Sequence, residues 1–146
     1  MSGQLLGKKE RISLAVLTAG LVAVLSIAAW LAPDPSGLGT HQQLGLPACT
    51  SVAILGIRCP ACGMTTSWAL MIEGRVPEAI RANLGGSMLF LVAALSVPWL
   101  VGVIWTASSR LRDQWGLFAM SGSVVSMAIA LGLWAWNLVT TKLQIL

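Results

Sequence analysis

The sequence predicts an all-α integral membrane protein with three transmembrane helices and a short helical, Cys-containing extracytoplasmic loop between the first and the second. Two properties of the whole chain favour this class. Only 10% of its residues are charged, against about 25% in soluble domains, and its mean hydropathy is +0.82. A third observation is that three uncharged stretches reach the length of roughly 20 apolar residues that crosses the hydrocarbon core of a bilayer.

The three expected spans cover residues 12–32, 87–105 and 115–139, within a single membrane domain over residues 1–146. Residues 33–86, between the first two spans, form what we call the Cys-motif loop. Tryptophan favours the membrane–water interface, and tryptophans stand near the span ends: Trp30, Trp105, Trp115, Trp134 and Trp136.

The first span follows three basic residues, Lys8, Lys9 and Arg11, as the core of a secretory signal peptide would. Its apolar run is longer than the roughly 7–15 residues usual in a signal peptide, and Ala-Trp-Leu-Ala-Pro lacks a small-residue cleavage site. We therefore expect a retained membrane anchor.

Basic residues near the span ends predict the orientation, because Lys and Arg favour the cytoplasmic side. The N-terminal tail and the short second connection are rich in them, whereas the longer Cys-motif loop has only Arg58, Arg75 and Arg81. The N-terminus is thus expected in the cytoplasm, and the Cys-motif loop on the outer side of the membrane. The net charge of +4 is dispersed, without the basic patch of a nucleic-acid-binding protein.

Proline and glycine divide the Cys-motif loop into short elements. The apolar run 51–57 is too short to span a membrane and fits a strand-like, interfacial or re-entrant segment. Pro60 favours the first position of a helix, which makes Cys59 the expected N-cap and places Cys62 in the first turn. A further short helix is expected to end at Gly85-Gly86 and to lead into the second span.

The candidate site consists of Cys49, Cys59, Cys62 and the only histidine, His41, which all lie within 22 residues of sequence. Cys-x2-Cys is the spacing of half a zinc site, and three cysteines with one histidine complete a tetrahedral zinc shell. In this interpretation the four residues bind one zinc ion. Metal ligation would then contribute directly to the folding of a loop with little core of its own.

Two other interpretations of the cysteines are open. Cys59 and Cys62 at a helix N-terminus would form a redox pair, because the helix dipole lowers thiol pKa, and Cys49 would be the resolving partner. Quinone-linked disulfide-forming enzymes use such pairs, but they have a four-helix core where this chain has three spans. Alternatively, a structural disulfide from Cys49 to Cys59 or Cys62 would stabilise the loop by about 2–3 kcal/mol.

The cysteines belong to a longer motif. Cys49 is followed by Gly56-Ile57-Arg58-Cys59-Pro60-Ala61-Cys62-Gly63-Met64-Thr65-Thr66, then by Glu73-Gly74 and Ala82-Asn83 before a hydrophobic span. This pattern resembles the domain-of-unknown-function 2752 family, small bacterial membrane proteins marked by Cys-Pro-x-Cys-Gly-x-Thr. The resemblance covers about Cys49 to Trp105, and the form here is similar to that of planctomycete-type bacteria.

The resemblance implies the membrane topology, in the inner (cytoplasmic) membrane of a bacterium, and marks Cys49, Cys59 and Cys62 as the site. It brings no activity. Many members of the family have Arg and Pro at two positions where this chain has Thr66 and Leu84. Any role of that arginine elsewhere in the family is therefore not carried over to this protein.

The function that we expect from the sequence is structural. The spans contain no ionisable side chain of the kind that marks an ion pathway, so we expect a non-enzymatic subunit or scaffold of a larger membrane assembly. Its partners would be the lipid bilayer and other membrane proteins, not nucleic acid, and zinc or a disulfide would stabilise its loop. The alternative is a membrane thiol–disulfide oxidoreductase or metal-handling factor that uses Cys59 and Cys62.

Overall fold

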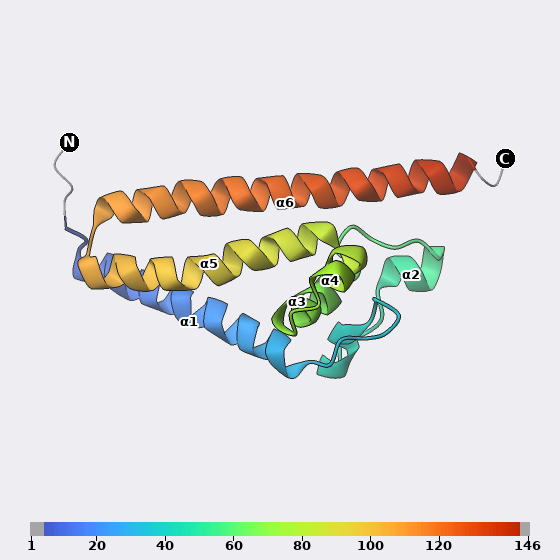
Figure 1. Cartoon of the computed structure of the whole chain (residues 1–146), viewed down its shortest axis with the longest axis horizontal. Coiled ribbons are helices and arrows are strands. Elements are labelled where there is room, and N and C mark those ends of the chain that lie inside the picture. The colour runs from blue at the N-terminus through green and yellow to red at the C-terminus, as the bar shows by residue number, and fades with distance from the viewer. Residues whose placement is uncertain (1–4, 144–146) are drawn as a thin grey trace.

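The structure is a computed structural model that describes residues 5–143 of the chain. Three long helices dominate it: α1 (Lys8–Trp30), α5 (Leu84–Thr106) and α6 (Ser109–Leu143) (Figure 1). Each is long and apolar enough to cross a membrane. Over the described range the chain forms helices and turns without a strand, apart from an isolated bridge pair. The predicted all-α class with three spans is confirmed.

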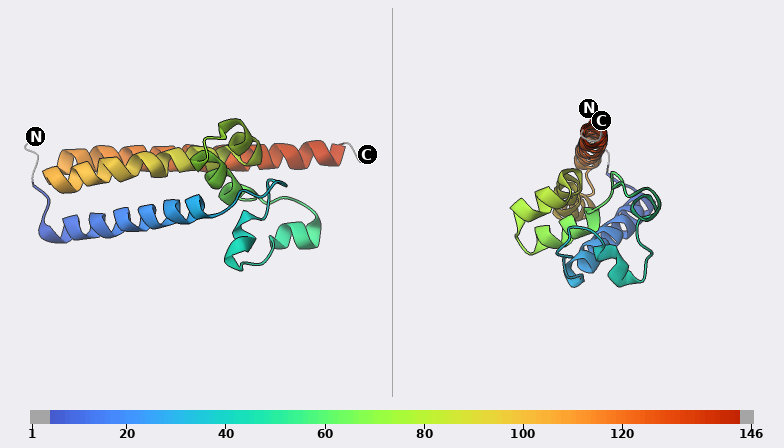
Figure 2. Two further views of the ribbon diagram at one scale, coloured as in Figure 1. Left: turned by 60° about the horizontal axis from the view of Figure 1, so that its bottom comes forward. Right: turned by 90° about the vertical axis from the view of Figure 1, so that its right-hand side faces the viewer.

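The central helix is α5, which lies between α1 and α6 and packs against both (Figure 2). Small residues let α5 and α6 approach closely: a Cβ atom on Gly122 would lie 2.6 Å from Cγ2 of Val92. At 1.5 Å per residue, α5 is about 34 Å long and α6 about 52 Å long. Because the two helices are antiparallel and joined by a short turn, the C-terminal part of α6 continues beyond the start of α5.

Four short helical elements lie between α1 and α5: a 3-10 helix (Thr40–Leu44), α2 (Thr50–Leu55), α3 (Met64–Ile72) and α4 (Val76–Ala82). Both α3 and α4 pack against the beginning of α5, and α3 also contacts α1. The short helical, Cys-containing segment between the first two spans is therefore confirmed. The apolar run 51–57 is mainly helical, as α2, and ends at Gly56 in the left-handed conformation with φ +65°.

The predicted start of the helix after the cysteines is wrong by four residues. The helix begins at Met64 and not at Pro60, because Gly63 before it adopts φ +84°, which interrupts any helix from Cys59 onward. Residues 59–63 instead form a tight turn, in which the amide of Cys62 donates to the carbonyl oxygen of Cys59 at 3.0 Å. The two cysteines thus precede the helix, and Cys62 does not sit in its first turn.

The pair Gly85-Gly86 does not end a helix either. The helix α4 ends at Ala82, Asn83 is extended, and both glycines lie in the first turn of α5. Close packing explains their position, since a Cβ atom on Gly85 would lie 2.6 Å from Cβ of Ala130. This contact also fixes the level at which α6 passes the beginning of α5.

The end of the bundle opposite the Cys-motif loop is closed by the N-terminal segment. The amide of Leu6 donates to the carbonyl oxygen of Ala107 at 2.8 Å, and Arg112 forms an ion pair with Glu10 at 2.6 Å. A buried apolar cluster lies behind these contacts and consists of Leu6, Leu14, Leu100 and Val103.

Candidate metal centre

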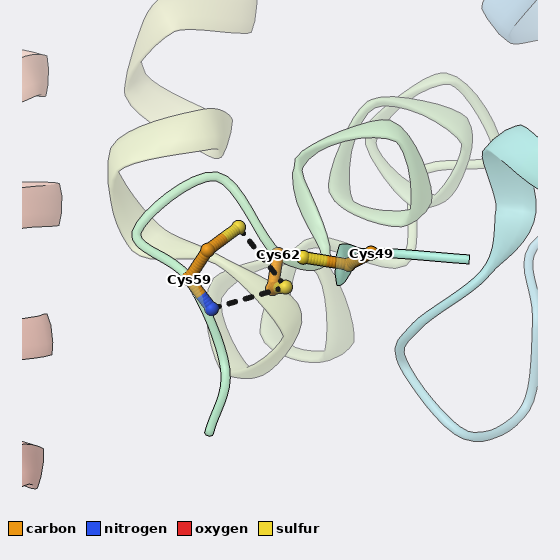
Figure 3. A group of neighbouring side chains, drawn as sticks. All are labelled: Cys49, Cys59 and Cys62. Carbon is orange, nitrogen blue, oxygen red and sulfur yellow. Dashed lines mark hydrogen bonds between the residues drawn. The ribbon is translucent and has the colours of Figure 1, made fainter. Parts of the chain in front are cut away.

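The three cysteines form one cluster. The sulfur atoms of Cys49, Cys59 and Cys62 all lie within 4.8 Å of one another, and those of Cys59 and Cys62 are 3.1 Å apart. Figure 3 shows the three side chains converging from two separate stretches of chain. Each residue is partly buried, so the sulfurs are shielded without being sealed from solvent.

The turn that holds two of the cysteines orders its own sulfur atoms. Besides the bond that closes the turn, the amide of Cys59 donates to Sγ of Cys62 at 3.2 Å. Cys49 arrives from the other side, as the N-cap residue of α2. A backbone N–H directed at a sulfur is the environment that a thiolate prefers, because it stabilises the negative charge.

Asn83, between α4 and α5, fastens this turn to the membrane helices. Its Nδ2 donates to the carbonyl oxygens of Pro60 and Cys62, at 3.0 and 3.1 Å. Its Oδ1 accepts from the amide of Gly86 at 2.7 Å and so caps the N-terminus of α5. One side chain therefore connects the turn of the two cysteines to the start of the second span.

Two further contacts hold the Cys-motif loop at this end of the bundle. Nε1 of Trp134, on α6, donates to the carbonyl oxygen of Arg58 at 2.7 Å. The hydroxyls of Thr40 and Thr66 are 2.8 Å apart and buried. The third span and the 3-10 helix are thus both connected to the segments that carry the site.

Gly63 is required where the turn meets α3. At φ +84° it occupies the left-handed region, which residues with a Cβ atom rarely adopt. A Cβ atom there would also lie 2.6 Å from the carbonyl oxygen of Ala82 and 2.9 Å from that of Gly37. The glycine therefore allows three chain segments to meet directly beneath the cysteines.

The thiols differ in acidity. The backbone N–H of Val52, followed by the thiols of Cys62 and Cys59, lowers the pKa of Cys49 to about 7. Burial, followed by the neighbouring thiol of Cys59, raises the pKa of Cys62 to about 12. The expectation that a helix N-terminus lowers the pKa of Cys62 is therefore wrong, because that thiol lies before the helix and is more buried.

His41 is near the cluster but is not part of it. It lines the same cavity, of about 330 Å³, as the three cysteines. Its Nε2 lies 3.2 Å from the carbonyl oxygen of Pro47, and its ring nitrogens are not among the ligand atoms that gather within 4.8 Å. Ligation by His41 stays a prediction, and it would require the ring to leave that carbonyl.

The sulfur positions fit a soft divalent ion. Three thiolates at about 2.3 Å from a tetrahedral zinc ion are about 3.8 Å from one another. The observed sulfur separations begin at 3.1 Å and stay within 4.8 Å, so none differs from that value by more than about 1 Å. Shifts of about 1 Å or less would therefore bring Cys49, Cys59 and Cys62 to zinc-ligand distances.

One comparison with known proteins coincides with this site. Residues 49–97 match the model of a family described as a protein of unknown function, DUF2752. This segment is therefore similar to the DUF2752 family. The match confirms the resemblance expected from the motif and includes the three cysteines, Gly63 and Asn83, whereas His41 and Trp134 lie outside it. No curated protein and no solved structure matches the chain. The planctomycete-type variety stays a prediction.

Sequence reasoning missed how the site is held. Asn83 was assigned no role of its own, although an asparagine directly before an apolar helix is a recognisable N-cap signal. Its bonds to Pro60 and Cys62 have no such signal, because they join residues more than 20 apart in sequence. Trp134 was expected only as an interfacial residue, and nothing local indicates its bond to Arg58.

Proposed function

We propose that Cys49, Cys59 and Cys62 bind one zinc ion, and that this ion fixes the Cys-motif loop of a non-enzymatic subunit or scaffold in a bacterial inner-membrane assembly. The convergence of three thiols from two separate segments, all within 4.8 Å, carries this proposal. A disulfide would account for only two of them. A metal ion is the partner that accounts for all three at once.

The proposed zinc site is mainly a structural one. Zinc ligation adds folding free energy directly, and the loop around the cysteines has few buried apolar side chains among its described residues. His41, which lines the same cavity, is the proposed fourth ligand. With four protein ligands the coordination shell would be closed, as in zinc sites that stabilise folds and do not catalyse.

The membrane helices support a role as a subunit. No charged residue lies within the expected spans 12–32, 87–105 and 115–139. The spans therefore lack the ionisable side chains that line an ion pathway. Because α5 lies between α1 and α6, each outer helix has a flank available to lipid or to another membrane protein. In this proposal the chain forms one membrane domain, with its N-terminus cytoplasmic and the Cys-motif loop outside.

The test is elemental analysis of the purified protein in detergent, combined with mass determination after thiol alkylation. We expect about one zinc per chain, and three thiols that react only after a chelator is added. Cys62→Ser should lower the zinc content at least fivefold. Thr65→Ala is the matched control, since Thr65 lines the same cavity but offers no sulfur.

A zinc-free protein with one intact disulfide and one rapidly alkylated cysteine would contradict the zinc proposal. It would support the second candidate, a thiol–disulfide oxidoreductase, for which the 3.1 Å separation of the Cys59 and Cys62 sulfurs is the favouring observation. In its exchange step, the Cys49 thiolate attacks Sγ of Cys59 in a Cys59–Cys62 disulfide. The Cys49–Cys59 bond forms, the Cys59–Cys62 bond breaks, and Cys62 leaves as a thiolate that takes a proton from water.

We rank this exchange second because its leaving group is unfavourable. Exchange is faster when the departing thiol has a low pKa, and burial raises the pKa of Cys62 to about 12. The acidity of Cys49, with a pKa of about 7, suits both an attacking thiolate and a zinc ligand. It therefore does not distinguish the two candidates.

A further inference from the structure

Cys59 and Cys62 also line a second cavity, between the Cys-motif loop and α6. We call it the lateral groove; it has a volume of about 800 Å³. Its walls come from residues 56–60 and Cys62 of the loop, from residues 80–84 at the junction of α4 and α5, and from five residues of α6: Ala130, Leu133, Trp134, Asn137 and Leu138.

The charge of the lateral groove is unbalanced. Two arginines, Arg58 and Arg81, line it, and no acidic residue does. Neither arginine takes part in the ion pairs found over residues 5–143, which involve Arg75 and Arg112. The acid nearest in sequence, Glu78, is bonded to Arg75. The groove is therefore lined by two exposed arginines beside apolar residues.

The depth of the groove follows from the packing of α6 on α5. Ala130 faces Gly85 at the beginning of α5, where the apolar span starts. At 1.5 Å per residue, Trp134 lies about 6 Å and Leu138 about 12 Å farther along the axis of α6. The headgroup layer on each side of a bilayer is about 5–8 Å thick. Measured from the start of α5, the groove thus lies at the level of lipid phosphates, so that the membrane-crossing part of α6 ends near Ala130 and not at the expected residue 139. Trp134 is then at the depth that its ring favours.

From this charge and this depth we infer that the lateral groove binds an anionic phospholipid. The phosphate would be held by Arg58 and Arg81, because guanidinium groups bind phosphate oxygens in bidentate fashion. The apolar side chains of Ile80, Leu133 and Leu138 would contact the beginning of the acyl chains. The anion would also hold the loop against α6, next to the bond between Trp134 and Arg58.

This inference is independent of the metal proposal, because neither arginine ligates zinc in that proposal. The test is native mass spectrometry of the full chain in detergent, with phosphatidylglycerol or phosphatidylcholine added at equal concentration. Both lipids carry a phosphate, but only phosphatidylglycerol has a net negative charge. We expect the bound fraction of phosphatidylglycerol to exceed that of phosphatidylcholine at least fivefold.

The double variant Arg58→Gln/Arg81→Gln should remove this preference and lower phosphatidylglycerol binding at least fivefold. The matched control is Arg110→Gln at the opposite end of the α5–α6 hairpin, which should change binding less than twofold. Equal melting temperatures and equal thiol protection would show that the double variant is folded.

Three outcomes would overturn the inference. The first is unchanged lipid binding by the folded double variant, and the second is an equal loss in Arg110→Gln, which would mean non-specific charge attraction. The third is displacement of the lipid by about 10 mM inorganic phosphate, which would indicate a site for the free ion and not for a lipid. If the double variant misfolds, the single variants are measured instead, and Arg58→Gln should lower phosphatidylglycerol binding at least twofold.

Discussion

The two ends of this membrane protein are built in opposite ways. At the N-terminal end, α5 and α6 are joined by Ala107 and Ser108 alone, and the chain before α1 closes the bundle. At the other end, the 53 residues from 31 to 83 separate α1 from α5. The first end is held by a backbone bond and by surface ion pairs, and the second by side chains that bond to the backbone of distant segments.

This difference indicates where function resides. A short turn and an exposed ion pair need no particular chemistry, and many sequences would serve there. The end that carries the Cys-motif loop, which we call the Cys end, has stricter requirements. It needs a glycine with positive φ, an asparagine that binds two carbonyls and caps a helix, and three thiols at one point. Specific residues held at long range are what a binding site needs and what a connection between helices does not.

The largest effect is expected where the Cys end tolerates no side chain. Gly63→Ala should destabilise the protein by about 2–4 kcal/mol, because positive φ costs a non-glycine residue about 1 kcal/mol and overpacking adds about 1–3 kcal/mol. The added Cβ atom would meet the carbonyl oxygen of Ala82 at 2.6 Å. Thermal unfolding in detergent, followed by circular dichroism, measures the change.

Gly74→Ala is the matched control for this variant. Gly74 has φ +75°, close to that of Gly63, but a Cβ atom there would have no neighbour within 4 Å. It should cost about 1 kcal/mol, from backbone conformation alone. Equal losses in the two variants would contradict the close approach of three segments beneath the cysteines.

The next effect concerns Asn83, which connects the two cysteines to the second span. Asn83→Ala removes three hydrogen bonds, each with a net value of about 1 kcal/mol, so we expect a loss of about 3 kcal/mol. Zinc affinity should also fall at least tenfold, because the turn at Pro60 and Cys62 is no longer positioned. Zinc competition against a coloured chelator measures the affinity.

Asn83→Asp separates the two roles of this residue. The carboxylate keeps the acceptor that caps Gly86 but loses the amide that donates to Pro60 and Cys62. We expect much of the helix stability to be retained while zinc affinity still falls. An affinity equal to that of the unaltered protein would mean that Asn83 acts only as a helix cap.

A smaller difference is expected among the thiols themselves in metal-free, reduced protein. Cys49, with its lowered pKa, should be alkylated with a midpoint near pH 7, whereas Cys62, with a pKa near 12, should react slowly throughout pH 6–9. The lowered pKa of Cys49 favours the folded state above pH 9 and ceases to do so as the pH falls through 7. The raised pKa of Cys62 favours the folded state below pH 9, and this contribution to stability is lost as the pH rises toward 12.

Peptide mapping after brief treatment with iodoacetamide measures both rates. At pH 7.5 the rate at Cys49 should exceed that at Cys62 at least tenfold, because the thiolate is the reacting species. Added zinc should suppress both rates. Indistinguishable rates without zinc would contradict the unequal environments of the two thiols.

The sequence predicted the three spans well and the structure around the cysteines in outline only. The three spans follow from apolar length, and their helices differ from the expected ranges mainly at the ends. The spacing predicted a group of Cys49, Cys59, Cys62 and His41, of which the structure brings the three cysteines together. The local geometry was not, because Cys-Pro indicates a helix start at Pro60 while Gly63 interrupts it three residues later.

The contacts that orient the site were beyond sequence reasoning for a simple physical reason. Trp134 bonds to Arg58, 76 residues away, and Thr40 bonds to Thr66, 26 residues away. Helical periodicity and capping rules act over about four residues. Long-range pairs depend on how the helices pack, and in a membrane protein that packing is governed by small residues such as Gly85 and Gly122 and not by hydropathy.

The smallest effect belongs to the N-terminal end. Arg112→Gln removes the ion pair with Glu10, whose side chains are 36% and 49% exposed. Water and salt screen such a pair, so we expect the melting temperature to change by less than about 2 °C, with zinc content and lipid preference unaltered. A loss as large as that of Asn83→Ala would mean that the two ends are held with equal stringency, and that the positioned residues of the Cys end serve general stability and not a bound ion.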